Sequence, residues 1–388
     1  MSSIAKRAHN IWDLRAIAKE KLPRAIYEFV ERGTEDDLLI RQNREALERI
    51  KFNPRTLRDV TGRDPSITLF GKSQALPIVV APTGIADLMC YRGERAVAAA
   101  ASGAGIPFTQ TTSSTTSFAD IAQVTQSGRW LQLYLWEQRD LSWAMIERAA
   151  EQGFEVLVVT VDTPKLPLRE FNKRNGMTNP IRANPTLAMD FMAHPRWSLS
   201  VLLRYILTGG VPQFANYPAE HRTSIRTVSR IENAQSLSWA DVDELRKRWA
   251  GPLVIKGVLN REDAKLAREH GVDGVCVSNH GGRNFDSSPA SIDVLAEIVD
   301  DVGSDITVLW DGGVRRGADV LKALAIGAKA ALIGRATLFG AAAAGETGAR
   351  HALALLANEI DMAMAMLGIT SIGELDRSHL RAETVIGM

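Results

Sequence analysis

The chain has 388 residues, and its 46 Lys and Arg nearly balance its 45 Asp and Glu, which leaves a net charge of +1 at pH 7. Because the charges balance, the protein has no overall positive electrostatic field that would attract nucleic acid or an anionic membrane, so any anion site must be local. The two cysteines, Cys90 and Cys276, argue against a disulfide framework. No secretory signal and no apolar run of transmembrane length is found, so we expect a cytoplasmic protein.

The first part of the chain predicts helices. Residues 11–32 and 35–49 carry apolar side chains at helical spacing, with charged residues between them. We interpret residues 1–70 as an N-terminal helical extension of a single domain that spans residues 1–388.

Eight short apolar runs follow, each bounded by a turn signal, and they predict strands at residues 76–81, 107–111, 130–135, 156–161, 253–257, 274–278, 307–311 and 331–334. Helical patterns lie between most of them, at residues 94–104, 142–152, 261–270, 291–300 and 318–326. Eight strands alternating with helices predict an α/β fold, a (β/α)8 TIM barrel.

One interval breaks this alternation. About eighty residues separate Thr163 from Trp239, far more than a usual loop, so residues 165–240 are expected to form an insertion after strand four. Its middle, residues 191–214, is apolar and contains Arg196 and Arg204. Packing against the barrel, a subunit contact and an interfacial membrane patch are all open interpretations. After the barrel, residues 346–367 predict a long helix with an apolar face.

Polar residues gather where the predicted strands end. In a barrel of this kind the active site is built from the carboxyl ends of the strands. In chain order these ends carry Ala81, Pro82, Thr83, Thr111, Gln132, Tyr134, Thr160, Asp162, Lys256, Ser278, His280, Asp311, Gly334 and Arg335.

The last two strand ends predict a phosphate site. Gly313 and Gly334 let main-chain N–H groups approach an anion, and Arg315 and Arg335 add positive charge. A phosphate here would anchor a cofactor whose ring reaches the barrel axis, where four polar side chains could bind it: Gln132, Thr160, Lys256 and Ser278. FMN has this shape, and a reduced flavin would provide the negative charge that a buried lysine needs.

His280 and Arg283 place a general base beside a fixed cation, which is what proton abstraction from an acidic substrate requires. A histidine that only caps a turn is the simpler alternative. Asp162 and Asp311 also allow a barrel glycosidase, and a barrel that merely binds a phosphate ligand is a third hypothesis. No dinucleotide-binding motif or metal-ligand pattern is found, so we expect no metal.

Several ordered motifs resemble the FMN-dependent 2-hydroxy acid oxidase and dehydrogenase family, from about residue 11 to the last helix: Gln132-Leu133-Tyr134, Thr160-Val161-Asp162-Thr163-Pro164 with Arg169-Glu170, Ser278-Asn279-His280-Gly281-Gly282-Arg283 with Asp286, and Asp311-Gly312-Gly313-Val314-Arg315-Arg316-Gly317. The stretch from His194 to Leu199, followed by Gly210-Val211-Pro212-Gln213, is most similar to the mandelate dehydrogenase branch.

The resemblance implies a role for each matching residue. His280 would take a proton from the substrate α-carbon, or from its hydroxyl as hydride leaves, and Asp162 would hold the imidazole. Arg169 and Arg283 would bind the substrate carboxylate, with support from Tyr134. Lys256 would stabilise reduced FMN, and the phosphate would lie on Gly313, Arg315, Gly334 and Arg335. The resemblance also implies a homotetramer.

Two positions depart from the family pattern. Phe29 stands where the family has a tyrosine that helps to bind the carboxylate, and Ser113 stands where glycolate oxidase has a tryptophan. These changes predict a roomier pocket and a bulky or aromatic L-2-hydroxy acid. Gly84 stands where oxygen-using members often have alanine, which favours a quinone as electron acceptor over oxygen with peroxide release. Residues 191–214 would then provide a peripheral membrane contact.

Overall fold

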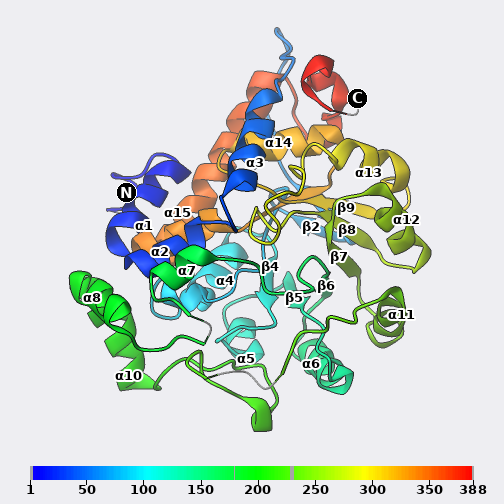
Figure 1. The fold of residues 1–388 in the computed structure, drawn as a ribbon. Helices are drawn as coiled ribbons and strands as arrows, with labels where there is room; N and C mark the ends of the chain where they lie inside the picture. Colours follow the sequence, from blue (N-terminus) through cyan, green and yellow to red (C-terminus); the bar gives the residue numbers. More distant parts are fainter. Residues whose placement is uncertain (1–2, 179, 228–230, 387–388) are drawn as a thin grey trace.

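The computed structural model describes residues 3–178, 180–227 and 231–386. Eight parallel strands form a closed barrel in the order β10-β3-β4-β5-β6-β7-β8-β9 (Figure 1). They overlap the eight predicted strands: β3 (Ile78–Val80), β4 (Phe108–Thr111), β5 (Arg129–Leu133), β6 (Val156–Thr160), β7 (Leu253–Val258), β8 (Gly274–Val277), β9 (Thr307–Trp310) and β10 (Ala330–Ile333). The predicted (β/α)8 fold is confirmed.

The alternation of side chains along each strand decides which residues face the barrel axis. One cluster of buried side chains fills the interior, and it includes Trp130, Val158, Val254, Cys276 and Leu309. Side chains two positions further along the same strands point the same way. The carboxyl end of the barrel interior is therefore lined by Gln132, Thr160, Lys256, Ser278 and Asp311.

A short hairpin closes the opposite end of the barrel. Strands β1 (Ile67–Leu69) and β2 (Lys72–Gln74) pair antiparallel, and the turn between them places Phe70 against Trp130, with ring centroids 5.8 Å apart. The sequence analysis missed this hairpin because its strands are short and β2 consists only of polar residues. The floor of the barrel is thus covered by apolar contact between the hairpin and the barrel interior.

Helices follow the strands and cover the outside of the barrel, as predicted. The predicted helix at 291–300 begins later, at Leu295, because Ser291 lies in a preceding turn and its hydroxyl donates to the carbonyl of Asp311. The outer helices are α4 (Gly93–Gly103), α5 (Phe118–Ala122), α6 (Arg139–Glu151), α11 (Trp239–Arg248), α12 (Arg261–Glu269), α13 (Leu295–Val302), α14 (Gly317–Ile326) and α15 (Arg335–Leu367).

The N-terminal extension corrects one prediction. Residues 11–32 form two helices, α1 (Ile11–Lys21) and α2 (Arg24–Glu31), instead of one. Leu22 has extended backbone with ψ 143°, as expected for a residue that precedes proline. The third helix, α3 (Leu38–Arg49), contacts the loops that follow β8 and β9 and lies beside α14 and α15 in Figure 1.

The C-terminal helix is longer than predicted. It starts directly after β10 and is interrupted at Ala344 and Gly345, so the predicted helix 346–367 is its second half. Gly345 has φ 59° and ψ −140°, a conformation that essentially only glycine adopts. Helix α15 packs beside α1, and His351 in its second half bonds the carbonyl of Ala8 (Figure 1).

The insertion after β6 lies to one side of the barrel (Figure 1). It contains α7 (Glu170–Arg174), α8 (Pro185–Ala193), α9 (Pro195–Trp197), a π-helical turn η2 (Ser198–Leu203), α10 (Arg204–Thr208) and a 3-10 turn η3 (Ala219–His221). Trp197 anchors it, since its indole N–H donates to the carbonyl of Leu88 at 2.9 Å. Within the described residues, no helix is long and apolar enough to cross a membrane.

Candidate active site

A cavity of about 320 Å³ lies at the carboxyl end of the barrel, where the sequence analysis expected the active site. Of the predicted site residues, only Asp162 and Ser278 are absent from its lining; both lie behind the wall and contact residues that do line it. The cavity is lined by Phe29, Ala81, Pro82, Thr83, Thr111, Gln132, Tyr134, Thr160, Arg169, Lys256, His280, Arg283, Asp311, Gly313, Arg315, Gly334 and Arg335, among others.

His280 and Asp162 form a hydrogen-bonded pair in the wall. The imidazole Nδ1 lies 3.0 Å from Asp162 Oδ1 and 3.2 Å from Oδ2. Burial lowers the pKa of His280 below its ordinary value of 6.5, although Asp162 acts in the opposite direction. Burial opposes ionisation of Asp162, but His280 and neighbouring donors outweigh it and the pKa of the carboxyl is lowered. At neutral pH the pair is therefore a neutral imidazole oriented by a carboxylate, which is the form that accepts a proton.

The backbone around His280 is unusual. His280, Gly281 and Gly282 have φ values of 57°, 65° and 75°, so three successive residues are left-handed. A non-glycine residue in this region carries strain that its surroundings must maintain. The backbone N–H of His280 donates to Ser278 Oγ at 3.1 Å, which ties the turn to the end of β8. The turn sends the imidazole back over the barrel mouth toward Asp162.

Lys256 is held at the bottom of the cavity by a buried ion pair. Its Nζ lies 3.0 Å from Asp311 Oδ2 and donates to Ser278 Oγ at 2.7 Å, while Ser278 donates to Asp311 Oδ1 at 2.7 Å. Burial would lower the pKa of Lys256, but Asp311 and Asp162 raise it above its ordinary value. A permanent cation therefore faces the end of the barrel interior.

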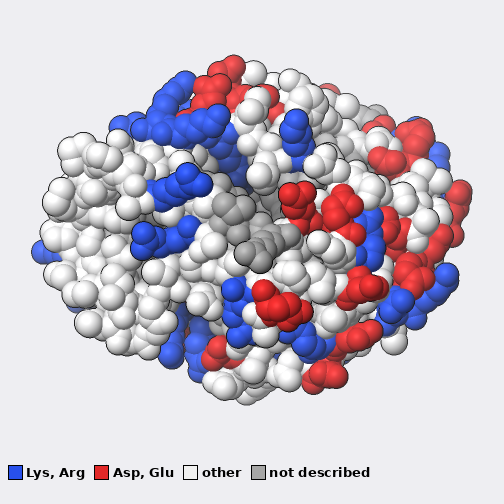
Figure 2. Space-filling model, turned by 60° about the horizontal axis from the view of Figure 1, so that its bottom comes forward, with Lys and Arg blue, Asp and Glu red and all other residues white. Residues whose placement is uncertain are grey.

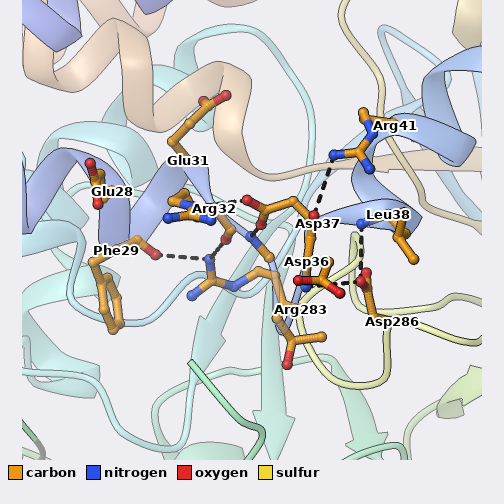
Figure 3. A network of polar contacts seen from close by, with 12 residues as sticks. Glu28, Phe29, Glu31, Arg32, Asp36, Asp37, Leu38, Arg41, Arg283 and Asp286 are labelled. Atoms are coloured by element: carbon orange, nitrogen blue, oxygen red, sulfur yellow. Dashed lines mark hydrogen bonds and ion pairs between the residues drawn. The ribbon is translucent and has the colours of Figure 1, made fainter. Parts of the chain in front are cut away.

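Three arginines lie above this level with no carboxylate partner. Within the described residues, the bonds recorded for Arg169, Arg283 and Arg335 all end on backbone carbonyls. Arg169 donates to Arg283, and Arg335 donates to Val30 and Gly281. Arg283 donates to Phe29 and Arg32 (Figure 3).

Burial and mutual repulsion disfavour these charges. Burial first, then Arg169 and Arg335, lower the pKa of Arg283 well below its ordinary value. Burial lowers the pKa of Arg169 to about 10, and its Nε has no partner within the described chain. Part-buried cations gathered in this way need an anion to compensate them. The geometry therefore describes a binding site for an anionic group beside the His280 base.

The loop after β9 provides a second place for an anion. Arg315 is buried; one Nη donates to the carbonyl of Val314, and its Nε has no partner among the described residues. Burial, with repulsion from Arg335, lowers its pKa to about 9. Gly313, two residues earlier in the same loop, has φ 90°, a backbone conformation that favours glycine.

Comparison with known proteins identifies the family to which this chain belongs. The family model described as FMN-dependent dehydrogenase matches residues 18–382. An (S)-mandelate dehydrogenase from Pseudomonas putida is 36% identical over 98% of this chain and 96% of its own length. A peroxisomal (S)-2-hydroxy-acid oxidase from Oryza sativa subsp. japonica is 39% identical over 96% of each chain. The chain belongs to the FMN-dependent dehydrogenase family.

Solved structures agree with this assignment. A crystal structure described as the monotopic membrane protein (S)-mandelate dehydrogenase superimposes with a TM-score of 0.90, at 35% identity, over 96% of this chain and 99% of the other. The chain is thus an FMN-dependent oxidoreductase that oxidises 2-hydroxy acids, and the glycosidase and phosphate-ligand hypotheses are left without support.

The residues at the barrel mouth fit FMN. An unpaired guanidinium atom of Arg315 and the glycine backbone at Gly313 and Gly334 form the kind of cradle that holds a phosphate. Lys256, which stays charged, lies at the other end of the same cavity. Between them, Gln132 donates to Thr160 Oγ1 at 3.0 Å, so both side chains are already oriented toward the interior.

The departures from the family pattern also lie at the cavity. The Phe29 ring faces Arg283, with 5.4 Å between the guanidinium carbon and the ring centroid, and offers no hydroxyl there. Ser113 lines the cavity and its Oγ lies 3.4 Å from the hydroxyl of Tyr217, which comes from the insertion. The small serine leaves space at this wall.

The sequence analysis missed several residues of the lining. Val30, Ile85, Leu332 and Leu338 contribute apolar surface, for which an apolar residue in a sequence gives no signal. Val30 also accepts a hydrogen bond from Arg335 through its backbone. A backbone carbonyl can accept such a bond whatever its side chain is, so the sequence gives no signal for it.

Proposed function

We propose that this enzyme oxidises a bulky or aromatic L-2-hydroxy acid to the corresponding 2-oxo acid. Bound FMN supplies the two-electron acceptor for this reaction. The observation that carries the proposal is the grouping, around one cavity, of an oriented neutral imidazole and three part-buried arginines whose recorded bonds, within the described residues, all end on backbone carbonyls. A base beside an anion site is suited to a substrate that carries a carboxylate next to the bond to be broken.

In this proposal Arg283 and Arg169 bind the substrate carboxylate. Arg283 keeps one nitrogen on the carbonyls of Phe29 and Arg32, both at 2.8 Å, which fixes the plane of its guanidinium. Its remaining donors can then form the parallel pair of bonds that a carboxylate prefers. Tyr134, whose pKa burial raises, stays a neutral hydroxyl donor next to them.

His280 then accepts a proton from the substrate through Nε2, since Nδ1 is bonded to Asp162. The carboxylate of Asp162 stabilises the imidazolium that forms. Lys256 holds positive charge where the FMN ring would lie, and the phosphate would lie on Gly313, Arg315, Gly334 and Arg335. Ala81, Pro82, Thr83 and Thr111 would contact the ring from the first two strands.

The size of the substrate is tested by anaerobic mixing. The FMN-loaded enzyme is mixed with glycolate, lactate, 2-hydroxyoctanoate and (S)-mandelate, and the loss of flavin absorbance is followed. The small Ser113 and the missing hydroxyl at Phe29 predict that the larger acids react faster. Faster reaction with glycolate or lactate than with every larger acid contradicts the proposal.

We further propose that the electrons pass to a quinone rather than to oxygen. Gly84, at the cavity wall, and an exposed apolar surface on the insertion both support this choice. The expected result is slow reoxidation in air and fast reoxidation by a soluble quinone. Peroxide release in air at the rate of turnover contradicts it.

The insertion supports peripheral contact with a membrane. The described side chains of α8 to α10 include five strongly exposed apolar residues: Met189, Met192, Leu199, Ile206 and Leu207. Figure 2 shows this side of the molecule as a broad area with few charged groups, most of them Lys or Arg. Such a surface would enter the headgroup region of a bilayer.

Sedimentation with phospholipid vesicles tests this contact. A variant with Ile206→Ser and Leu207→Ser is expected to stay in the supernatant. The matched control, Met366→Ser, removes a similarly exposed apolar side chain from α15 and is expected to bind like the unchanged enzyme. Equal binding of both variants contradicts membrane contact through residues 191–214. The homotetramer and the cytoplasmic location stay predictions, and light scattering of the FMN-loaded enzyme tests the first.

A further inference from the structure

We propose that Asp286 is a positioning residue, which fixes the loop from Ser278 to Asp286, called here the histidine loop, against helix α3. In this way it sets the geometry of His280 and Arg283 toward the substrate. The inference rests on the proposed function for the roles of those two residues. Its structural basis is independent of the substrate.

The N-terminus of α3 depends on Asp286. The carboxylate, which is almost fully buried, accepts the backbone N–H groups of Asp36, Leu38 and Leu39 at 3.2, 3.0 and 2.9 Å (Figure 3). A helix start leaves N–H groups that need acceptors, and a negative charge there is favoured. The cap residue of α3, Asp37, makes no such bond with its own side chain. The side chain of Asp37 instead accepts the backbone N–H of Gly33. The acceptor at the start of α3 is therefore Asp286, which lies about 250 positions away in the sequence.

The backbones of the two segments are in direct contact beside this carboxylate. A Cβ added to Gly33 would lie 2.2 Å from the carbonyl oxygen of Gly282, and a Cβ on Gly282 would lie 2.9 Å from the backbone nitrogen of Ile40. Neither position has room for a side chain. Arg283, next in the histidine loop, donates to the carbonyl of Arg32 at 2.8 Å (Figure 3).

The other end of the histidine loop is held by the same helix. Asn43 donates to Asn279 Oδ1 at 3.1 Å, and Asn279 donates back to Asn43 Oδ1 at 2.8 Å. Asn279 directly precedes His280. Helix α3 thus holds the loop on both sides of the strained left-handed turn that directs the imidazole.

Loss of the Asp286 carboxylate removes one of these two attachments. Arg283 and His280 should then occupy a wider range of positions, since the bonds between Asn43 and Asn279 lie at the other end of the loop, and the bond from Arg283 to the carbonyl of Arg32 ends in the segment that leads into α3. A purely structural cap would lower stability alone. A positioning residue also changes substrate affinity and the pH profile, because Asp162 acts against burial and raises the pKa of His280, and this contribution depends on how the loop holds the imidazole.

The experiment compares the FMN-loaded wild type with Asp286→Ala and Asp286→Asn. Asparagine keeps one oxygen acceptor, so its effects should be intermediate. For Asp286→Ala we expect KM to rise about tenfold or more, binding of an unreactive 2-oxo acid to weaken equally, and the acid limb of kcat/KM to move. We also expect faster hydrogen exchange at backbone amides in residues 36–40 and 279–286 together.

The control is Asn10→Ala. Asn10 accepts the backbone N–H of Asp13 at 3.0 Å and caps α1 in the same N-terminal extension, and no contact of its side chain with the histidine loop is recorded in the described chain. It should leave KM, the pH profile and exchange in the loop unchanged. If Asp286→Ala does not fold, the asparagine variant carries the test.

A variant that folds, binds the oxo acid within twofold of wild type and keeps loop exchange unchanged overturns the inference. The exchange measurement requires no turnover, so it tests Asp286 even if the wild type oxidises none of the acids offered. That second outcome would contradict the proposed function alone.

Discussion

Replacement of Asp162 by asparagine tests the His280–Asp162 pair most sharply. The two side chains lie 3.0 Å apart, Nδ1 to Oδ1, and are largely buried. At an effective dielectric constant of about 20, a full charge pair at this distance attracts by about 5.5 kcal/mol. An amide keeps a neutral hydrogen bond of about 1 kcal/mol. Since the imidazolium exists only after proton transfer, most of the difference of roughly 4 kcal/mol raises the barrier, which corresponds to about a thousandfold in rate.

The assay is anaerobic reduction of the bound flavin by (S)-mandelate in a stopped-flow instrument. Asp162→Asn should be slower by about 10²- to 10⁴-fold, the range for a general base that loses its support. Asp162 raises the pKa of His280, so its loss should also move the acid limb of the profile to lower pH. The control is Asp293→Asn, which removes a surface ion pair to Arg49. A loss of less than tenfold, with an unchanged pH profile, refutes the reasoning.

Three further predictions follow from the site. Because burial lowers the pKa of His280 below 6.5, the midpoint of the acid limb of kcat/KM should lie below pH 6.5, whereas a midpoint above 6.5 contradicts the assigned environment. Lys256→Met leaves the carboxylate of Asp311 buried without its cation, so chemical denaturation should show that the free energy of unfolding falls by about 3–5 kcal/mol. The double variant with Asp311→Asn should recover part of this loss. An unchanged denaturation midpoint for Lys256→Met argues against a charged pair. Phe29→Tyr adds a hydroxyl near the proposed site of the substrate carboxylate. With lactate and mandelate as substrates, KM should fall by about two- to tenfold, the equivalent of one hydrogen bond. A higher KM for both acids would contradict the placement of the substrate carboxylate.

Much of the barrel could be predicted because its signals are local. A buried parallel strand is a short apolar run, and alternation along it determines which residues face the axis. The strand positions of Lys256 and Ser278 therefore predict the buried sites at which both side chains lie. Pro23 marks a helix boundary in the sequence, but the apolar residues keep helical spacing on both sides of it, and this spacing led to the prediction of a single helix.

What could not be predicted depends on contacts distant in the sequence. The carbonyls of Phe29 and Arg32 that orient Arg283 have no sequence signature. Asp286 was visible only as part of a motif, and its role as acceptor for α3 appears when two segments about 250 residues apart meet. The left-handed backbone at His280 also has no sequence signature, since a positive φ is uncommon for any residue other than glycine.

The most direct measurement is a crystal structure of the FMN-loaded enzyme with an unreactive 2-oxo acid. The account predicts the phosphate on the loops of Arg315 and Gly334, the ring of FMN against Lys256, and the acid's carboxylate on Arg169 and Arg283, with its C2 atom toward His280 Nε2. A carboxylate bound elsewhere, with Arg283 still engaged only by backbone carbonyls and His280 remote from C2, would contradict it.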